Sequence, residues 1–140
     1  MNSAFDTDVL TLILAGYEPY RHRVGAIPIE RQYVPIVAVE ELLRGRFNMI
    51  RQSESGKSKQ PLPDAYGRLQ ELLLESRNFK ILPFTAEAEQ LVDAWRASRI
   101  RIGTQDLRIA AICVAHNAKL VSRNKRDFEL VPGLNLEVWN

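Results

Sequence analysis

The chain has 140 residues and a nearly balanced charge, because 19 Lys and Arg stand against 17 Asp and Glu for a net charge of +2. That balance excludes a uniformly basic, histone-like binder of nucleic acids, and 46% hydrophobic residues exclude a disordered chain. The single cysteine excludes an intramolecular disulfide. The length predicts one domain over residues 1–140. With no membrane-length apolar stretch and no signal-peptide pattern, we expect a cytoplasmic protein that does not contact a membrane.

The first half of the chain alternates short apolar runs with helical patterns. Residues 4–5 predict a first strand, and Asp8 is expected to cap a helix over residues 9–16, which ends at a glycine. The apolar run at 33–38 predicts a second strand. Apolar residues at helical spacing then predict a helix over 39–50.

The second half repeats this alternation after one loop-like segment. Residues 53–63 are rich in Ser, Lys and Pro and are expected to form a flexible connection within the domain. Asp64, Thr85 and Thr104 are each expected to cap a helix. Further strands are expected at 80–82, 118–122 and 134–138. The alternation predicts an α/β fold with a central, mostly parallel sheet.

Acidic residues from distant segments fall where such a sheet would bind a ligand, just beyond the carboxyl ends of its strands. Asp6 ends the first strand, Glu40 and Glu41 follow the second, and Asp127 follows the strand at 118–122. Asp106 lies at the start of an apolar helix. Unpaired carboxylates repel one another, and a divalent metal relieves that repulsion. Oxygen ligands of this kind suit Mg²⁺, which activates water and supports phosphoryl displacement.

Each of these acids also has a purely structural interpretation. An Asp at a helix start is commonly a cap, and we expect that role for Asp8. One of Glu40 and Glu41 is expected to be only a solvated helix residue. No Walker-type glycine loop is present, so the chain is not expected to be a nucleotide triphosphatase.

Four segments resemble the PIN-domain nucleases, and in particular the VapC-type toxin ribonucleases of bacterial toxin–antitoxin pairs. They are 5–10 (FDTDVL), 39–45 (VEELLRG), 102–111 (IGTQDLRIAA) and 120–128 (LVSRNKRDF), and the tail at 131–134 also resembles the family ending. The third and fourth segments carry most of the specificity. The resemblance implies a single PIN-like domain, an α/β/α sandwich, across nearly the whole chain.

Carried over by position, the resemblance implies a catalytic, metal-binding site of four acids supported by three polar residues. The acids are Asp6, Glu41, Asp106 and Asp127, and the supporting residues are Thr7, Ser122 and Asn124. Glu41 is preferred to Glu40 because the family acid directly precedes the Leu-Leu-x-Gly pattern. Two positions depart from the family: Ala38 replaces a frequent Ser or Thr, and Ser122 replaces a frequent Thr but keeps the hydroxyl.

The implied activity is that of an endoribonuclease that depends on Mg²⁺ or Mn²⁺. A water activated by the metal would hydrolyse the RNA phosphodiester and leave a 5′-phosphate and a 3′-hydroxyl. The implied partners are RNA and a small antitoxin protein, within a homodimer or a toxin–antitoxin hetero-oligomer. Neither the RNA target nor toxicity follows from the sequence.

Eight basic residues and one acid lie between residues 96 and 126. They belong either to solvated helix faces or to a rim that holds the RNA backbone beside the acids. We favour the rim for the five that flank Asp106 and Asp127, which are Arg99, Arg101, Arg123, Lys125 and Arg126.

Two rival hypotheses remain open. A haloacid-dehalogenase-like phosphatase would use Asp6 as a nucleophile, although such folds commonly need a longer chain and a downstream Lys. A non-catalytic PIN-like module would bind RNA or a protein without cutting it. Four mutually repulsive carboxylates argue against a non-catalytic module, and metal binding discriminates between that module and the nuclease. A phosphoaspartate trapped at Asp6 would favour the phosphatase.

Overall fold

The computed structural model describes residues 1–140 and contains one parallel five-stranded sheet in the order β3-β2-β1-β4-β5. This architecture confirms the predicted α/β class with a parallel sheet. The strand register places Ala4 beside Tyr33 on one side and beside Leu120 on the other. The strands are β1 (Ser3–Phe5), β2 (Gln32–Pro35), β3 (Ile81–Leu82), β4 (Lys119–Ser122) and β5 (Leu136–Val138).

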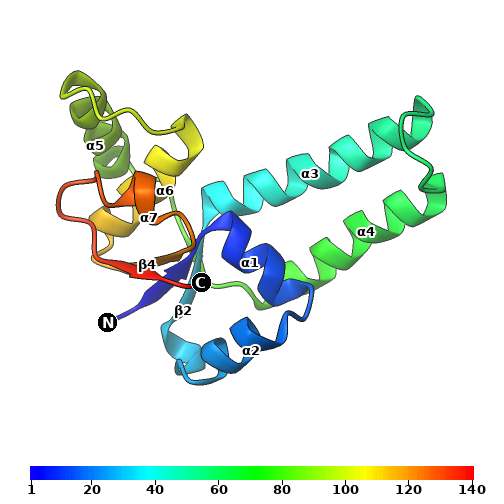
Figure 1. Cartoon of the computed structure of the whole chain (residues 1–140), viewed down its shortest axis with the longest axis horizontal. Helices are drawn as coiled ribbons and strands as arrows, with labels where there is room; N and C mark the ends of the chain where they lie inside the picture. The colour runs from blue at the N-terminus through cyan, green and yellow to red at the C-terminus, as the bar shows by residue number, and fades with distance from the viewer.

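Helices connect all the strands and lie on both sides of the sheet (Figure 1). Because parallel crossovers are right-handed, the connections before β3 lie on one face and those after it on the other. The first group is α1 (Thr7–Leu14), α2 (Glu18–Gly25), α3 (Ile36–Glu54) and α4 (Leu62–Glu75). The second group is α5 (Ala86–Ala97), α6 (Thr104–Ala115) and α7 (Lys125–Phe128), and two short 3-10 helices, η1 (Ile29–Arg31) and η2 (Ser76–Asn78), complete the chain.

Helices α3 and α4 form a hairpin that projects away from the sheet (Figure 1). The segment predicted as a loop over 53–63 is its turn, although α3 continues to Glu54 and α4 begins at Leu62. The hydroxyl of Ser53 donates to the carbonyl of Gln60 at 2.7 Å and ties the turn together. None of the helices combines the length and the apolar composition that crossing a membrane requires.

Several predicted boundaries are wrong because the prediction misplaced the first residue of a helix. The strand predicted over 33–38 ends at Pro35, and α3 begins at Ile36. Proline lacks the N–H that would continue the ladder, and its fixed backbone angle suits the residue before a helix. Thr104 is the first residue of α6 rather than its cap, and Asp64 lies in the first turn of α4. The Thr85 cap of α5 is confirmed by its bond to the N–H of Ala88.

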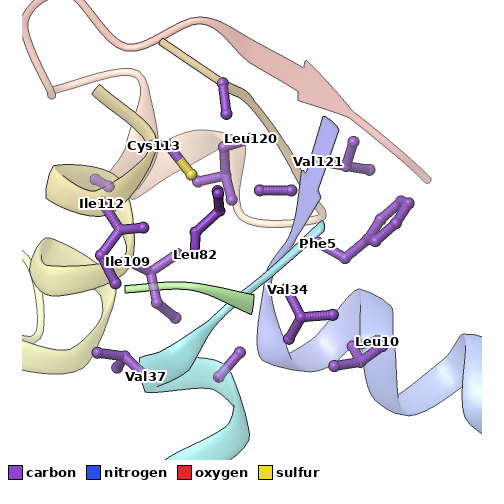
Figure 2. Close-up of a cluster of buried hydrophobic side chains, with 14 of the residues drawn as sticks. Phe5, Leu10, Val34, Val37, Leu82, Ile109, Ile112, Cys113, Leu120 and Val121 are labelled. Atoms are coloured by element: carbon purple, nitrogen blue, oxygen red, sulfur yellow. The ribbon is translucent and has the colours of Figure 1, made fainter. Parts of the chain in front are cut away.

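The core lies on both faces of the sheet because successive strand side chains point in opposite directions. Figure 2 shows Leu120 beside Cys113 and Ile112 of α6, whereas the next residue, Val121, lies beside Phe5. All of these side chains are buried, including the single cysteine. This packing holds α6 against the sheet, and with it the acid in the first turn of that helix.

Ile109 offers a test of this packing because it is fully buried in α6 (Figure 2). Ile109→Ala is expected to lower the free energy of unfolding by about 2–5 kcal/mol, through lost burial and the cavity left behind. Leu73→Ala is the matched control on α4, since Leu73 is 53% exposed, and its effect should stay within about 0.5 kcal/mol. Urea unfolding followed by circular dichroism measures both. Equal losses in the two variants would contradict the assigned core.

Candidate functional site

The site is organised around Asp6, which directly follows the central strand β1. Its backbone is extended, so Asp6 caps α1, and its Oδ1 accepts from the N–H of Val9 at 2.9 Å. Its Oδ2 accepts from the hydroxyl of Ser122, the last residue of the neighbouring strand β4. The side chain is only 5% exposed. A carboxylate is therefore held between the first helix and two central strands.

This arrangement corrects the role predicted for Asp8. Asp6 caps the helix, so α1 begins at Thr7 and Asp8 belongs to its first turn. Asp8 is exposed to solvent and lines the same acidic cavity as Asp6. The Asp-Thr-Asp spacing could have predicted that Asp8 lies near Asp6, because a residue two positions after a cap lies at the same end of the helix.

The structure separates the roles of the adjacent glutamates on α3. Glu41 Oε1 accepts from the hydroxyl of Thr7 at 2.5 Å, which ties α3 to α1 beside Asp6. Glu40 instead accepts from Arg44 at 2.7 Å and from the amide of Gln105 at 2.8 Å. Of the two, only Glu41 lines the acidic cavity.

Asp106 approaches from the other face of the sheet, in the first turn of α6. It is half-buried and completes a cavity of about 250 Å³ that has no hydrophobic lining residue. The cavity is lined by Asp6, Thr7, Asp8, Glu41, Asp106 and Asn124. Three of the four predicted acids thus meet in one cavity at the carboxyl ends of β1 and β4.

Asp127, the fourth predicted acid, is near the cavity but does not line it. It lies in the short helix α7, whose cap Asn124 donates from its amide to Asp127 Oδ2 at 3.0 Å and accepts from the Asp127 N–H at 3.2 Å. The N–H of Asn124 donates to the Ser122 hydroxyl at 2.9 Å. Each of the three predicted polar residues therefore donates a hydrogen bond to a predicted acid. Thr7 donates to Glu41, Ser122 to Asp6 and Asn124 to Asp127.

Two acids of the cavity resist ionisation. Burial raises the pKa of Asp6 from 3.8 to about 6, against the opposing effect of the Ser122 and Val9 bonds, and the charges of Asp8 and Asp106 add to the rise. Burial also raises the pKa of Asp106, and the charges of Glu41, Asp127 and Asp8 raise it further. The cavity therefore holds more negative charge than its surroundings compensate.

The donor set of this cavity suits a hard divalent cation. All its side-chain donors other than the Asn124 amide nitrogen are oxygens, and the carboxylates repel one another for want of a positive partner. No three carboxyl groups are already placed to ligate a single ion. Mg²⁺ fits such a site because it keeps several waters and uses only one or two carboxylates directly.

The five predicted RNA-binding residues are exposed at the ends of α5, β4 and α7. They are Arg99, Arg101, Arg123, Lys125 and Arg126. None of them takes part in the three ion pairs of the structure. Arg123 immediately precedes Asn124, so this positive charge is adjacent in the chain to a residue that lines the cavity.

The sequence matches a family model described as "PIN domain" over residues 4–134, which includes every acid of the site. The chain belongs to the PIN domain family. Curated relatives of this PIN domain are Ribonuclease VapC1 of Rickettsia felis, 36% identical over 62 residues, and Ribonuclease VapC of Rickettsia bellii, 34% identical over 62 residues. Each match covers 41% of this chain and 46% of the relative, so it spans a little under half of either curated protein.

Solved structures share the PIN domain fold along the whole chain. VapBC2 of Rickettsia felis, bound to a promoter DNA fragment, aligns with a TM-score of 0.78 at 22% identity over 100% of both chains. DNA-bound VapBC of Salmonella typhimurium aligns with a TM-score of 0.79 at 20% identity, over 100% of this chain and 99% of that one. FitAcB of Neisseria gonorrhoeae aligns with a TM-score of 0.72 at 20% identity, over 99% and 96%. The predicted resemblance to this family and its fold is confirmed.

The raised pKa of Asp6 predicts how stability changes with pH in metal-free protein. The unfolded chain releases this proton near pH 3.8 and the folded one near pH 6, so stability falls as pH rises through that window. The penalty at neutral pH is about 3 kcal/mol. Asp6→Asn removes the charge and should raise the free energy of unfolding at pH 7.5 by up to that amount.

Urea unfolding with EDTA present measures this difference, which should shrink to near zero at pH 3.5. Asp64→Asn, which alters an exposed acid of α4, is the control and should show no comparable gain at pH 7.5. A destabilised Asp6→Asn protein at pH 7.5 would contradict the buried, unpaired charge assigned to Asp6.

Proposed function

We propose that this PIN domain is a divalent-metal-dependent endoribonuclease and the toxin of a type II toxin–antitoxin pair. The observation that carries the proposal is the cavity at the carboxyl ends of β1 and β4, where Asp6, Glu41 and Asp106 meet without a cationic partner. The relatives named Ribonuclease VapC support the choice of RNA as substrate.

Mg²⁺ or Mn²⁺ would be held by one or two of Asp6, Asp106 and Glu41 directly and by the others through water, with Asp8 and Asp127 contributing through their charge. When bound, such a metal promotes ionisation of water and stabilises negative charge on a phosphoryl group. The protein would orient the carboxylate oxygens of the site through hydrogen bonds. Ser122 and the Val9 N–H fix Asp6, the Thr7 hydroxyl fixes one oxygen of Glu41, and Asn124 fixes Asp127.

The geometry at Asp6 supports this role over that of a phosphatase nucleophile. Both of its carboxylate oxygens already accept hydrogen bonds, one from the Val9 N–H and one from Ser122. Each oxygen keeps a second lone pair that can ligate a metal, whereas a nucleophilic Asp would have to turn one of these hydrogen-bonded oxygens into line with the phosphorus. The surrounding acids would also repel an incoming phosphate unless a cation stood between them.

Exposed cations around the cavity would hold the RNA backbone. The rim of Arg99, Arg101, Arg123, Lys125 and Arg126 carries five positive charges free of ion pairs. Single-stranded or looped RNA would suit an open cavity better than a duplex, because its backbone can bend to present one phosphate.

The antitoxin partner is proposed from the solved relatives and from the α3–α4 hairpin. Two solved structures of this fold are described as a toxin–antitoxin complex from Klebsiella pneumoniae and as VapBC-5 of Mycobacterium tuberculosis, a member of the VapBC family of toxin–antitoxin systems. The hairpin exposes large apolar side chains, among them Phe47, Tyr66 and Leu73, each about half exposed. Large apolar side chains exposed on one hairpin are candidates for a protein-binding site.

Asp6→Asn tests the proposed activity directly. The change preserves the shape of the side chain but removes the charge that would attract the metal, so cleavage of total RNA with Mg²⁺ or Mn²⁺ should fall on the order of 100-fold or more. Wild-type protein treated with EDTA should be equally inactive and recover when Mn²⁺ is returned. Sequencing of the products should find 5′-phosphates at the cut sites.

The matched control is Asp64→Asn, prepared in the same way to exclude host nuclease. Full cleavage by Asp6→Asn would overturn the nuclease assignment. RNA binding without metal binding or cleavage by the wild type would instead establish the non-catalytic module, and a phosphoaspartate trapped at Asp6 would establish the phosphatase.

The basic rim predicts a steep dependence of RNA binding on salt. Replacing Arg123, Lys125 and Arg126 by alanine should weaken binding of single-stranded RNA and reduce the slope of log affinity against log salt by about 2, at about 0.7 per lost phosphate contact. Fluorescence anisotropy with the Asp6→Asn protein measures binding without cleavage. Lys57→Ala with Lys59→Ala, on the hairpin turn, is the control, and equal slopes in all variants would rule out the rim.

A further inference from the structure

Helices α3 and α6 come from opposite sides of the sheet, yet a side-chain hydrogen bond joins them beside the cavity. Gln105 Nε2 donates to Glu40 Oε1 at 2.8 Å. Each partner directly precedes an acid of the cavity, since Glu41 follows Glu40 and Asp106 follows Gln105. The bond therefore connects the two helices at the positions next to their site carboxylates.

The Gln105 amide is held at both ends, in one orientation only. Its Oε1 accepts from the guanidinium of Arg108 at 2.9 Å, while its Nε2 donates to Glu40. A guanidinium can only donate and a carboxylate can only accept, so the reverse orientation of the amide would lose both bonds. Glu40 is held in turn by Arg44, one turn further along α3.

Residues of this chain of contacts and their sequence neighbours line two different cavities. Glu41 and Asp106 line the acidic cavity, whereas Glu40 and Arg108 line a separate one of about 400 Å³ between α3, α5 and α6. The two cavities share no lining residue. Gln105 lines neither cavity, but it contacts Glu40 and Arg108 of one cavity and directly precedes Asp106 of the other.

We propose that Gln105 is a positioning residue that sets the separation of Glu41 and Asp106 by bridging Glu40 and Arg108. The inference rests on the proposed function, because it assigns a purpose to the spacing of those two acids. Gln105 acts through the helix backbones and touches neither the metal nor the substrate. No hydrophobic residue lines the acidic cavity, so the Gln105–Glu40 hydrogen bond fixes α3 relative to α6 beside it.

Exchanging the two polar partners tests the bridge. Gln105→Glu places a carboxylate against Glu40 and should weaken Mn²⁺ affinity about tenfold, the lower end for residues that orient ligands, with a lower kcat for RNA cleavage and little change in KM. The added negative charge would by itself favour a cation, so a loss of affinity reports on geometry. Glu40→Gln alone keeps an acceptor for Gln105 and should change little.

The double variant E40Q/Q105E carries the same net charge as the wild type and restores a donor–acceptor pair with its direction reversed. It should recover most of the Mn²⁺ affinity and kcat lost by Gln105→Glu. Arg68→Ala removes an exposed cation and its ion pair within α4 and is the control, with both quantities unchanged. Mn²⁺ affinity is measured by calorimetry without RNA, cleavage under saturating RNA, and folding by circular dichroism.

A double variant as impaired as Gln105→Glu, or a Gln105→Glu protein with wild-type Mn²⁺ affinity and kcat, overturns the bridge while leaving the nuclease assignment intact. A wild-type protein that neither binds Mn²⁺ nor cleaves RNA overturns the proposed function and the bridge with it. If Gln105→Glu does not fold, Glu40→Ala against Glu40→Gln gives the same comparison, and equal Mn²⁺ affinities in that pair overturn the bridge.

Discussion

The structure depends on one buried carboxylate at the junction of β1 and α1. Asp6 ends the central strand, caps the first helix through the Val9 N–H and accepts from Ser122 of the next strand. One side chain therefore orients α1, joins β1 to β4 and places a negative charge at the sheet edge. Burial of the Asp6 carboxyl raises its pKa, so the folded protein carries an energetically unfavourable charge at neutral pH.

The remaining acids are arranged around this charge by the topology of the sheet. The order β3-β2-β1-β4-β5 reverses direction at β1, so connections from both faces meet at its carboxyl end. Glu41 comes from one face and Asp106 from the other. The near-neutral total charge thus averages an acidic cavity with exposed basic residues.

The sequence predicted most strands and the existence of most helices. It misplaced the first residues of several helices. Apolar runs identify β1 and β4 because a buried strand leaves a continuous hydrophobic segment. The helix starts were misplaced because several residues nearby were able to cap. Asp8 was chosen over Asp6, although the bond from Ser122, 116 residues away, holds Asp6 in place. Helix α2 has no strongly apolar face and was not predicted.

The sequence by itself predicted Asp6, Glu41 and Asp106, three acids that the structure brings into one cavity, because the spacing within each motif is local and carries the resemblance to PIN domains. Only the tertiary structure decided how those motifs meet. It turned Glu40 toward Gln105 and Glu41 toward Thr7, and it brought Asp8 into the cavity. The physical reason is that the direction of a side chain on a helix is set by what packs against that helix, and those contacts come from segments far away in the chain.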